Sequence, residues 1–162
     1  MKVNEGVEWA VHCCLNLAWL EPRRLTVAKL AAFYELPAAY LNKQLQALSR
    51  AGIVSSVSGP RGGFELARPP DRITLMDVFT AIEGPEFAFR CAEIRQDGPA
   101  GTMAGTGGFG QPCAVAGAMR QAELAWRTEL AACTIADLLT TVERRSPKVN
   151  ERIRNWFDTA RV

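Results

Sequence analysis

The segment from residue 26 to residue 68 places two short helical patterns before a hairpin pattern, and this order constrains the fold more than any other feature. Thr26 is typical of a helix N-cap before VAKLAAFYEL, and Pro37 suits the first position of a second helix, AAYLNKQLQALSRAG, expected to end at Gly52. The runs IVSSV and FELAR follow, joined by the turn residues SGPRGG. This order predicts a helix-turn-helix with a β-hairpin wing.

The second of these helices has one apolar and one polar face. Leu41, Leu45 and Leu48 recur at helical spacing and are expected to be buried. The opposite side, with Gln44 at its flank, carries polar and basic residues that a DNA major groove accepts. The residues expected to contact DNA are Tyr40, Lys43, Gln44 and Arg50 on the helix and Arg61 and Gly62 in the wing turn. An ordinary helical pair with a hairpin and solvated charges is the alternative.

The rest of the chain is predicted to be helical around one glycine-rich loop. Residues 3–20 form a helix that Glu21-Pro22 ends, ITLMDVFTAIEG forms another, and residues 98–111 are expected to be a flexible loop. A long amphipathic helix begins at Pro112, and its apolar seam suits a second helix, which predicts a dimer. The seam residues are Val115, Met119, Ala122, Trp126, Leu130 and Cys133.

The expected fold class is therefore mainly α with a small β-hairpin wing. We expect a winged helix-turn-helix domain over residues 1–84 and a loop region over 85–111. The dimerisation helix and the C-terminal helices, TIADLLTTVERR and VNERIRNWFDTAR, follow over 112–162.

Composition limits the classes of protein that remain. With 48% apolar and 22% charged residues the chain is globular, and no apolar run approaches the roughly 20 residues that cross a bilayer. The first residues lack the apolar core of a signal peptide, so a cytoplasmic location without a membrane partner is expected. Residues 1–72 hold nine Lys/Arg against six Asp/Glu, a small excess of positive charge. The prediction of nucleic-acid binding therefore depends on the pattern of elements more than on net charge.

The chain has five cysteines, an odd number that favours metal or thiol chemistry over disulfides in a reducing compartment. Cys91 and Cys113 bracket the glycine-rich loop, although their spacing is too long for a CxxC motif. Two cysteines packed in a core would explain this pair as well. Cys13, Cys14 and Cys133 lie on apolar helix faces and are interpreted as packing residues.

Five stretches carry a resemblance to a known family: GVEWAVHCC, YLNKQLQALSRAGIVSSVSGPRGGFELARP, ITLMDVFTAIEG, RCAEIRQDGP and PCAVAGAMRQAELAWR. In this order they resemble the IscR/NsrR/RsrR family of iron-sulfur transcription regulators over nearly the whole chain. Within that family they are most similar to the redox-sensing RsrR type, which holds a [2Fe-2S] cluster. The wider family has three closely spaced loop cysteines and this chain lacks the middle one, which argues against an all-thiolate site like that of the nitric-oxide sensors.

The resemblance implies a homodimer in which each cluster lies between subunits. Cys91 and Cys113 of one chain, with Glu8 and His12 from the first helix of the other, are the implied ligands. Glu8 and His12 are an i, i+4 pair, so both side chains project from one helix face; an ordinary surface pair is the alternative. Trp9 is implied to change its packing with the state of the cluster, and a core anchor is the alternative.

The resulting hypothesis is a DNA-binding regulator, expected to be a repressor and not an enzyme. The redox state of a [2Fe-2S] cluster would control its affinity for a palindromic operator. A cluster-free winged-helix regulator that responds to thiol oxidation or a small ligand is the alternative. A small zinc enzyme, with Glu8 as base and His12 among the ligands, has no further convergent acid or base to support it.

Overall fold

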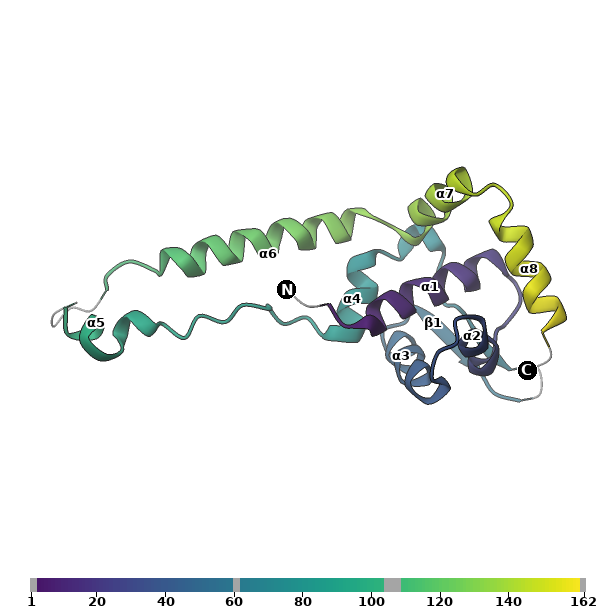
Figure 1. The fold of residues 1–162 in the computed structure, drawn as a ribbon, viewed down its shortest axis with the longest axis horizontal. Helices are drawn as coiled ribbons and strands as arrows, with labels where there is room; N and C mark the ends of the chain where they lie inside the picture. The colour runs from purple at the N-terminus through teal and green to yellow at the C-terminus, as the bar shows by residue number, and fades with distance from the viewer. Residues whose placement is uncertain (1–2, 60–61, 104–108, 161–162) are drawn as a thin grey trace. The chain divides into compact units, whose positions relative to one another are not determined.

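The computed structural model describes residues 3–59, 62–103 and 109–160 (Figure 1). The chain divides into two compact units: residues 86–129 form one, and the segments on either side, 2–85 and 130–162, together form the other. We call the first the cysteine unit, because Cys91 and Cys113 lie in it, and the second the helix-turn-helix unit. The functional boundaries expected from the sequence, at residues 84 and 111, remain a prediction.

The first helix, α1 (Glu5–Trp19), forms the centre of the helix-turn-helix unit. The Asn4 side chain caps it by accepting a hydrogen bond of 2.8 Å from the Gly6 amide. Ala10, Cys13 and Leu17 are almost completely buried. Because α4, α3, β2, α7 and α8 all contact α1, most of the helix surface is covered.

The next elements follow the expected order closely. Helix α2 (Val27–Phe33) is capped by Thr26, and α3 (Ala38–Arg50) buries its three predicted leucines completely. Strands β1 (Val54–Val57) and β2 (Gly63–Leu66) form an antiparallel hairpin in which Val54 pairs with Leu66. An isolated bridge between Leu25 and Phe64 joins the hairpin to the segment before α2. The short 3-10 helix η1 (Pro70–Arg72) leads onward from the hairpin.

Helices α4 and α7 begin side by side, each with a capping box. Thr74 caps α4 (Leu75–Glu83) and Thr134 caps α7 (Ile135–Arg145), each with the aspartate three residues later. The two starts are joined, because the Leu75 amide donates to the Cys133 carbonyl and the Ile135 amide to the Ile73 carbonyl, both at 2.8 Å. Helix α8 (Val149–Thr159) adds the fully buried Phe157, whose ring lies 5.0 Å from that of Phe33.

The cysteine unit has an extended segment from residue 86, the 3-10 helix η2 (Ile94–Gln96), α5 (Gly98–Met103) and most of α6 (Ala114–Ala132). The expectation of a loop throughout 98–111 is wrong for its first part, because α5 is helical. Its first turn contains Pro99, whose fixed φ suits a helix start, and the Gly101 amide donates to the Asp97 carbonyl at 3.2 Å. Residues 104–108 lie outside the described residues.

Helix α6 exposes its apolar seam in the single chain. Val115 is 64% and Met119 44% exposed, whereas Trp126 and Leu130 are half-buried. Glu123 is the only buried residue of this helix, all of which is described. No helix in the described part of the chain has the length and apolar character needed to cross a membrane.

Candidate DNA-binding face and metal centre

The outer face of α3 carries three of the residues expected to contact DNA. Tyr40, Lys43 and Arg50 are exposed. The Tyr40 hydroxyl donates a long hydrogen bond of 3.4 Å to the side chain of Asn4, just before α1. The Tyr40 ring also meets the half-buried Trp9 ring edge-on, at 5.3 Å between centroids. The face is therefore basic at Lys43 and Arg50 and is in contact with α1 at Tyr40.

Gln44 is not on this exposed face, which corrects the sequence expectation. Only 5% of Gln44 is exposed, because its side-chain amide occupies the space beside Gly6 on α1. A Cβ atom at Gly6 would lie 2.8 Å from both the Cδ and the Nε2 atom of Gln44. The absent side chain at Gly6 is thus the reason that a polar residue packs between α1 and α3.

The wing turn is described only in part. The Gly62 amide donates to the Gly59 carbonyl at 2.8 Å, which closes the turn. A Cβ at Gly62 would lie 2.2 Å from the Val57 carbonyl oxygen, so this position requires glycine. Arg61, expected at the tip, lies outside the described residues.

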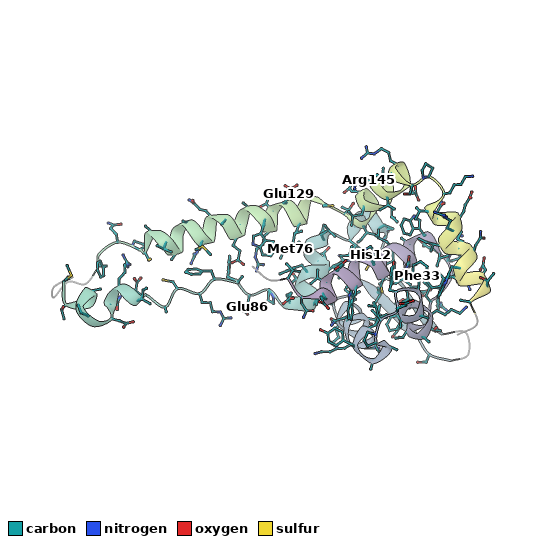
Figure 2. All side chains as sticks on the ribbon, viewed as in Figure 1. His12, Phe33, Met76, Glu86, Glu129 and Arg145 are labelled. Carbon is teal, nitrogen blue, oxygen red and sulfur yellow. The ribbon has the colours of Figure 1, made fainter. Side chains whose placement is uncertain are left out.

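Helix α1 presents Glu8 and His12 on the only stripe of its surface that is exposed, which also includes Glu5. Figure 2 labels His12 on this helix. The His12 ring lies 5.5 Å from the Tyr34 ring, and the Tyr34 hydroxyl accepts a hydrogen bond of 3.0 Å from the buried Asn16 side chain. The imidazole therefore has an ordered aromatic neighbour on one side and solvent on the other.

Cys91 and Cys113 come together in the cysteine unit, as expected if they serve one site. Their sulfur atoms and a carboxylate oxygen of Glu93 all lie within 4.8 Å of one another. Cys91 precedes η2, and Cys113 precedes the first turn of α6. Two thiols with a carboxylate at this separation could ligate a metal or a cluster, and thiolates are the ligands that iron-sulfur clusters use. The donor set therefore fits the implied group at its cysteine end.

Hydrogen bonding and charge around Cys113 favour the anionic form of its thiol. The Ala116 amide, in the first turn of α6, is the main reason that the pKa of Cys113 lies below its ordinary value, and the Arg95 guanidinium acts in the same direction. Arg95 also hydrogen-bonds to Glu93, which lowers the pKa of that carboxyl, and donates to the Gln111 carbonyl at 3.2 Å. Arg95 thus links the two segments that carry the cysteines.

Glu93 is the residue that sequence reasoning missed. Its backbone adopts a left-handed conformation, with φ of 52°, and its amide donates to the Cys91 sulfur at 3.4 Å. This turn brings its carboxylate within reach of both thiols. The available signal was the spacing Cys-x-Glu, which is too common in proteins to indicate a metal site.

Two of the remaining cysteines behave as the packing interpretation predicts. Cys13 and Cys14 are completely buried, and burial raises the pKa of Cys14 to about 12. Burial also raises the pKa of Cys13. Both thiols are therefore enclosed by the core, which favours their neutral forms. Cys133 is half-buried.

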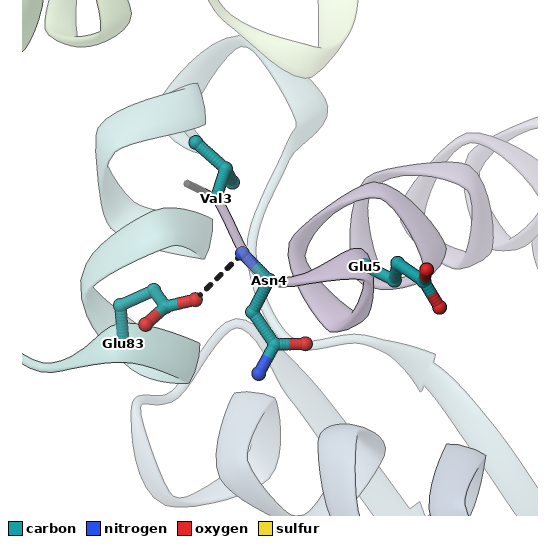
Figure 3. A pocket seen from close by; sticks show the side chains of 4 residues that line it. All are labelled: Val3, Asn4, Glu5 and Glu83. Atoms are coloured by element: carbon teal, nitrogen blue, oxygen red, sulfur yellow. Dashed lines mark hydrogen bonds between the residues drawn. The ribbon is translucent and has the colours of Figure 1, made fainter. Parts of the chain in front are cut away.

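A surface pocket lies at the start of α1 (Figure 3). Val3, Asn4, Glu5 and Glu83 line it, and the Asn4 amide donates to the Glu83 carboxylate at 3.0 Å. This bond ties the start of α1 to the end of α4. The pocket's described lining has two carboxylates and no basic side chain, so it does not resemble a binding site for an anionic ligand.

A helix pair followed by a hairpin is the architecture of winged-helix DNA-binding proteins. The Rrf2 family model, described as "Iron-dependent Transcriptional regulator", matches residues 3–141. The chain belongs to the Rrf2 family of transcriptional regulators.

Curated relatives support this assignment. Protein aau3 of Rhizobium meliloti is 29% identical over 150 residues, which cover 93% of this chain and 90% of that protein. The HTH-type transcriptional regulator IscR of Cereibacter sphaeroides is 27% identical over 107 residues, covering 64% of this chain and 69% of IscR. Other relatives, at 32% to 39% identity, align over 53% to 57% of their own length, so the chain spans about half of each.

Solved structures share the fold. T. potens IscR has a TM-score of 0.68 at 21% identity, covering 90% of this chain and 91% of that one. CymR, the global cysteine regulator of B. subtilis, has a TM-score of 0.65 at 23% identity, covering 87% of this chain and 98% of that one. The predicted fold class, mainly α with a hairpin wing, is therefore confirmed. These matches do not distinguish the RsrR type from the other members of the family.

Proposed function

We propose that this Rrf2-family regulator binds operator DNA under the control of a [2Fe-2S] cluster. Cys91 and Cys113 of one chain would hold the cluster together with Glu8 and His12 of a second chain. The observation that carries the proposal is the approach of the two thiols, with Glu93, to within 4.8 Å. When bound, a cluster would supply a one-electron couple, whose potential rises as imidazole replaces thiolate. We infer that the protein acts in the cytoplasm.

The proposed homodimer is supported by the exposed seam of α6. Val115 and Met119 are exposed apolar residues one helical turn apart, and Trp126 continues the same stripe. Long helices with such a stripe bury it against a second helix. We infer that a second copy of the chain covers this stripe. A palindromic operator also requires two copies, one for each half-site.

A route from the proposed ligands to DNA runs through α1. Trp9 lies between the two proposed ligands in sequence and contacts the ring of Tyr40 on α3. Gly6, on the preceding turn, packs against Gln44. A change in the position of α1 would therefore be transmitted directly to the proposed recognition helix.

Substitution of single cysteines tests the ligand set. Cys91→Ala and Cys113→Ala should each abolish the cluster, because thiolates are its least replaceable ligands. Cys14→Ala is the matched control and should keep the cluster, since Cys14 is buried in the other unit. The measurement is an anaerobic visible spectrum with iron and sulfide counts. A full cluster in Cys113→Ala would refute the site, and a colourless wild type would favour the cluster-free alternative.

The proposed DNA face is tested by removing one charge at a time. Lys43→Ala should weaken binding to specific and random DNA alike and lower the salt slope by about one, because a phosphate contact is lost. Lys148→Ala removes the same charge from an exposed residue at the start of α8 and should change neither quantity. Equal behaviour of the two variants in fluorescence anisotropy titrations would remove Lys43 from the interface.

A further inference from the structure

The buried carboxylate of Glu123 is a charged group that the proposed function does not use. Glu123 is only 4% exposed, halfway along α6. The Ala88 amide donates to both of its oxygens at 3.0 Å, and the Phe89 amide reaches one of them at 3.5 Å. A carboxylate is buried at such a place only where donors satisfy it.

Arg127 completes this arrangement from the next turn of α6. Its Nε donates to Glu123 at 3.0 Å, and its Nη2 donates to the Glu86 carbonyl at 2.6 Å. The guanidinium also lies over the Phe87 ring, 5.0 Å from its centroid. Glu123 and Arg127 therefore hold residues 86–89 against α6 through both backbone and ring contacts.

Among the described residues, no backbone-to-backbone hydrogen bond involves 86–92. The segment has no regular secondary structure, and Cys91 lies only two residues beyond Phe89. Cys113, the other thiol, immediately precedes the same α6 that carries Glu123. The side chains of Glu123 and Arg127 thus connect the segment bearing Cys91 to the helix that Cys113 precedes, in addition to the link that Arg95 makes to Gln111.

We propose that Glu123 and Arg127 form a clasp that positions Cys91 opposite Cys113. Glu123 is the positioning residue, and Arg127 keeps its carboxylate oriented toward the backbone amides. That the clasp helps to build a cluster site rests on the proposed function. The clasp itself is a property of the cysteine unit, and its effect can be measured without a metal.

The test compares Glu123→Gln with Glu129→Gln in the full-length, metal-free, reduced chain. Glutamine at position 123 keeps only one acceptor oxygen for the Ala88 and Phe89 amides and removes the ion pair with Arg127. Glu129 is exposed on the same helix and is the matched control; Figure 2 labels it together with Glu86. The readout is the rate at which diamide joins Cys91 and Cys113 within one chain, whereby both thiols are oxidised and diamide is reduced to its hydrazine.

Glu123→Gln should slow this intrachain disulfide about tenfold, because the two sulfurs no longer start close together. Alkylation of each thiol by iodoacetamide should be unchanged, which separates proximity from reactivity. Glu129→Gln should match the wild type in both assays. The described hydrophobic core lies outside residues 86–129, so a thermal unfolding transition at the wild-type temperature should accompany the change.

An unchanged disulfide rate in Glu123→Gln, or equal slowing in both variants, would overturn the clasp. Ala88 and Phe89 amide exchange gives a second measurement, with loss of protection expected in Glu123→Gln alone. A wild-type chain that forms the disulfide quickly but never binds iron and sulfide would leave the clasp standing. That result would refute the proposed function instead.

Discussion

The charge of Glu123 should make the segment that carries Cys91 sensitive to acid. Burial alone would raise the pKa of Glu123, but hydrogen bonds from the Ala88 amide and Arg127 outweigh it, so the pKa lies below its ordinary value. A carboxyl whose pKa is lower in the folded than in the unfolded chain stabilises the folded state fully above its unfolded pKa of about 4.3. This stabilisation is lost as the pH falls through the folded-state pKa.

Amide exchange at Ala88 should therefore show full protection at neutral pH, after correction for the intrinsic rate. The protection should be lost only below about pH 4.3, as Glu123 takes up a proton. In Glu123→Gln the same amide should exchange without this pH step. Protection that does not vary with pH in the wild type would mean that Glu123 is not the group that holds the segment.

Single residues also show which features of the candidate sites the sequence could predict and which it could not. Cys91 and Cys113 could be paired before the structure only through the family resemblance, because their spacing alone left two packed cysteines as the alternative. Glu93 could not be added, since its role depends on a left-handed backbone turn that no residue type at that position requires. Gln44 was expected near solvent, and its burial follows from the absence of a side chain at Gly6, on another helix.

At the scale of elements, the wing depends on a glycine with positive φ. Gly63 has φ of 145°, and a Cβ there would lie 2.7 Å from the Leu25 carbonyl oxygen. Gly63→Ala should therefore lower the free energy of unfolding by about 2–4 kcal/mol through backbone strain and steric clash. The wing should also lose its attachment to Leu25, because the Leu25–Phe64 bridge requires this close approach.

Gly59→Ala is the matched control for this prediction. Gly59 also has positive φ, at 107°, but among the described residues beyond its chain neighbours no atom lies within 4 Å of an added Cβ. Its cost should be backbone strain alone, about 1–2 kcal/mol. Urea denaturation measures both variants, and an equal loss of stability would show that the contact with Leu25 contributes nothing.

Elements with a local signal were predictable, and elements without one were not. Thr26 begins a helix where the sequence predicted, because an N-cap acts on the residues next to it. Helix α5 was missed, since glycine-rich composition favours a loop and only Pro99 indicated otherwise. Helix α6 starts at Ala114, two residues after the expected Pro112.

At the scale of the whole molecule, the order of elements predicted the fold, but not which parts pack together. Residues 130–162 form one compact unit with residues 2–85, which the sequence pattern does not indicate. The contacts responsible connect residues far apart in sequence, such as Phe33 with Phe157 and the Trp19 indole, which donates to Glu143 at 2.8 Å. Apolar periodicity shows which face of a helix is buried, but not which element covers it.

The central claim is that the state of the cluster sets the affinity for DNA. The most direct measurement is anaerobic fluorescence anisotropy with an operator selected from random DNA by the protein itself. Oxidised, dithionite-reduced and metal-free protein would be titrated at one salt concentration. Oxidised and reduced protein should differ in affinity by about tenfold or more, a coupling typical of allosteric proteins. Equal affinity in these two states would contradict redox control, and equal affinity in all three would contradict any role for a cluster in DNA binding.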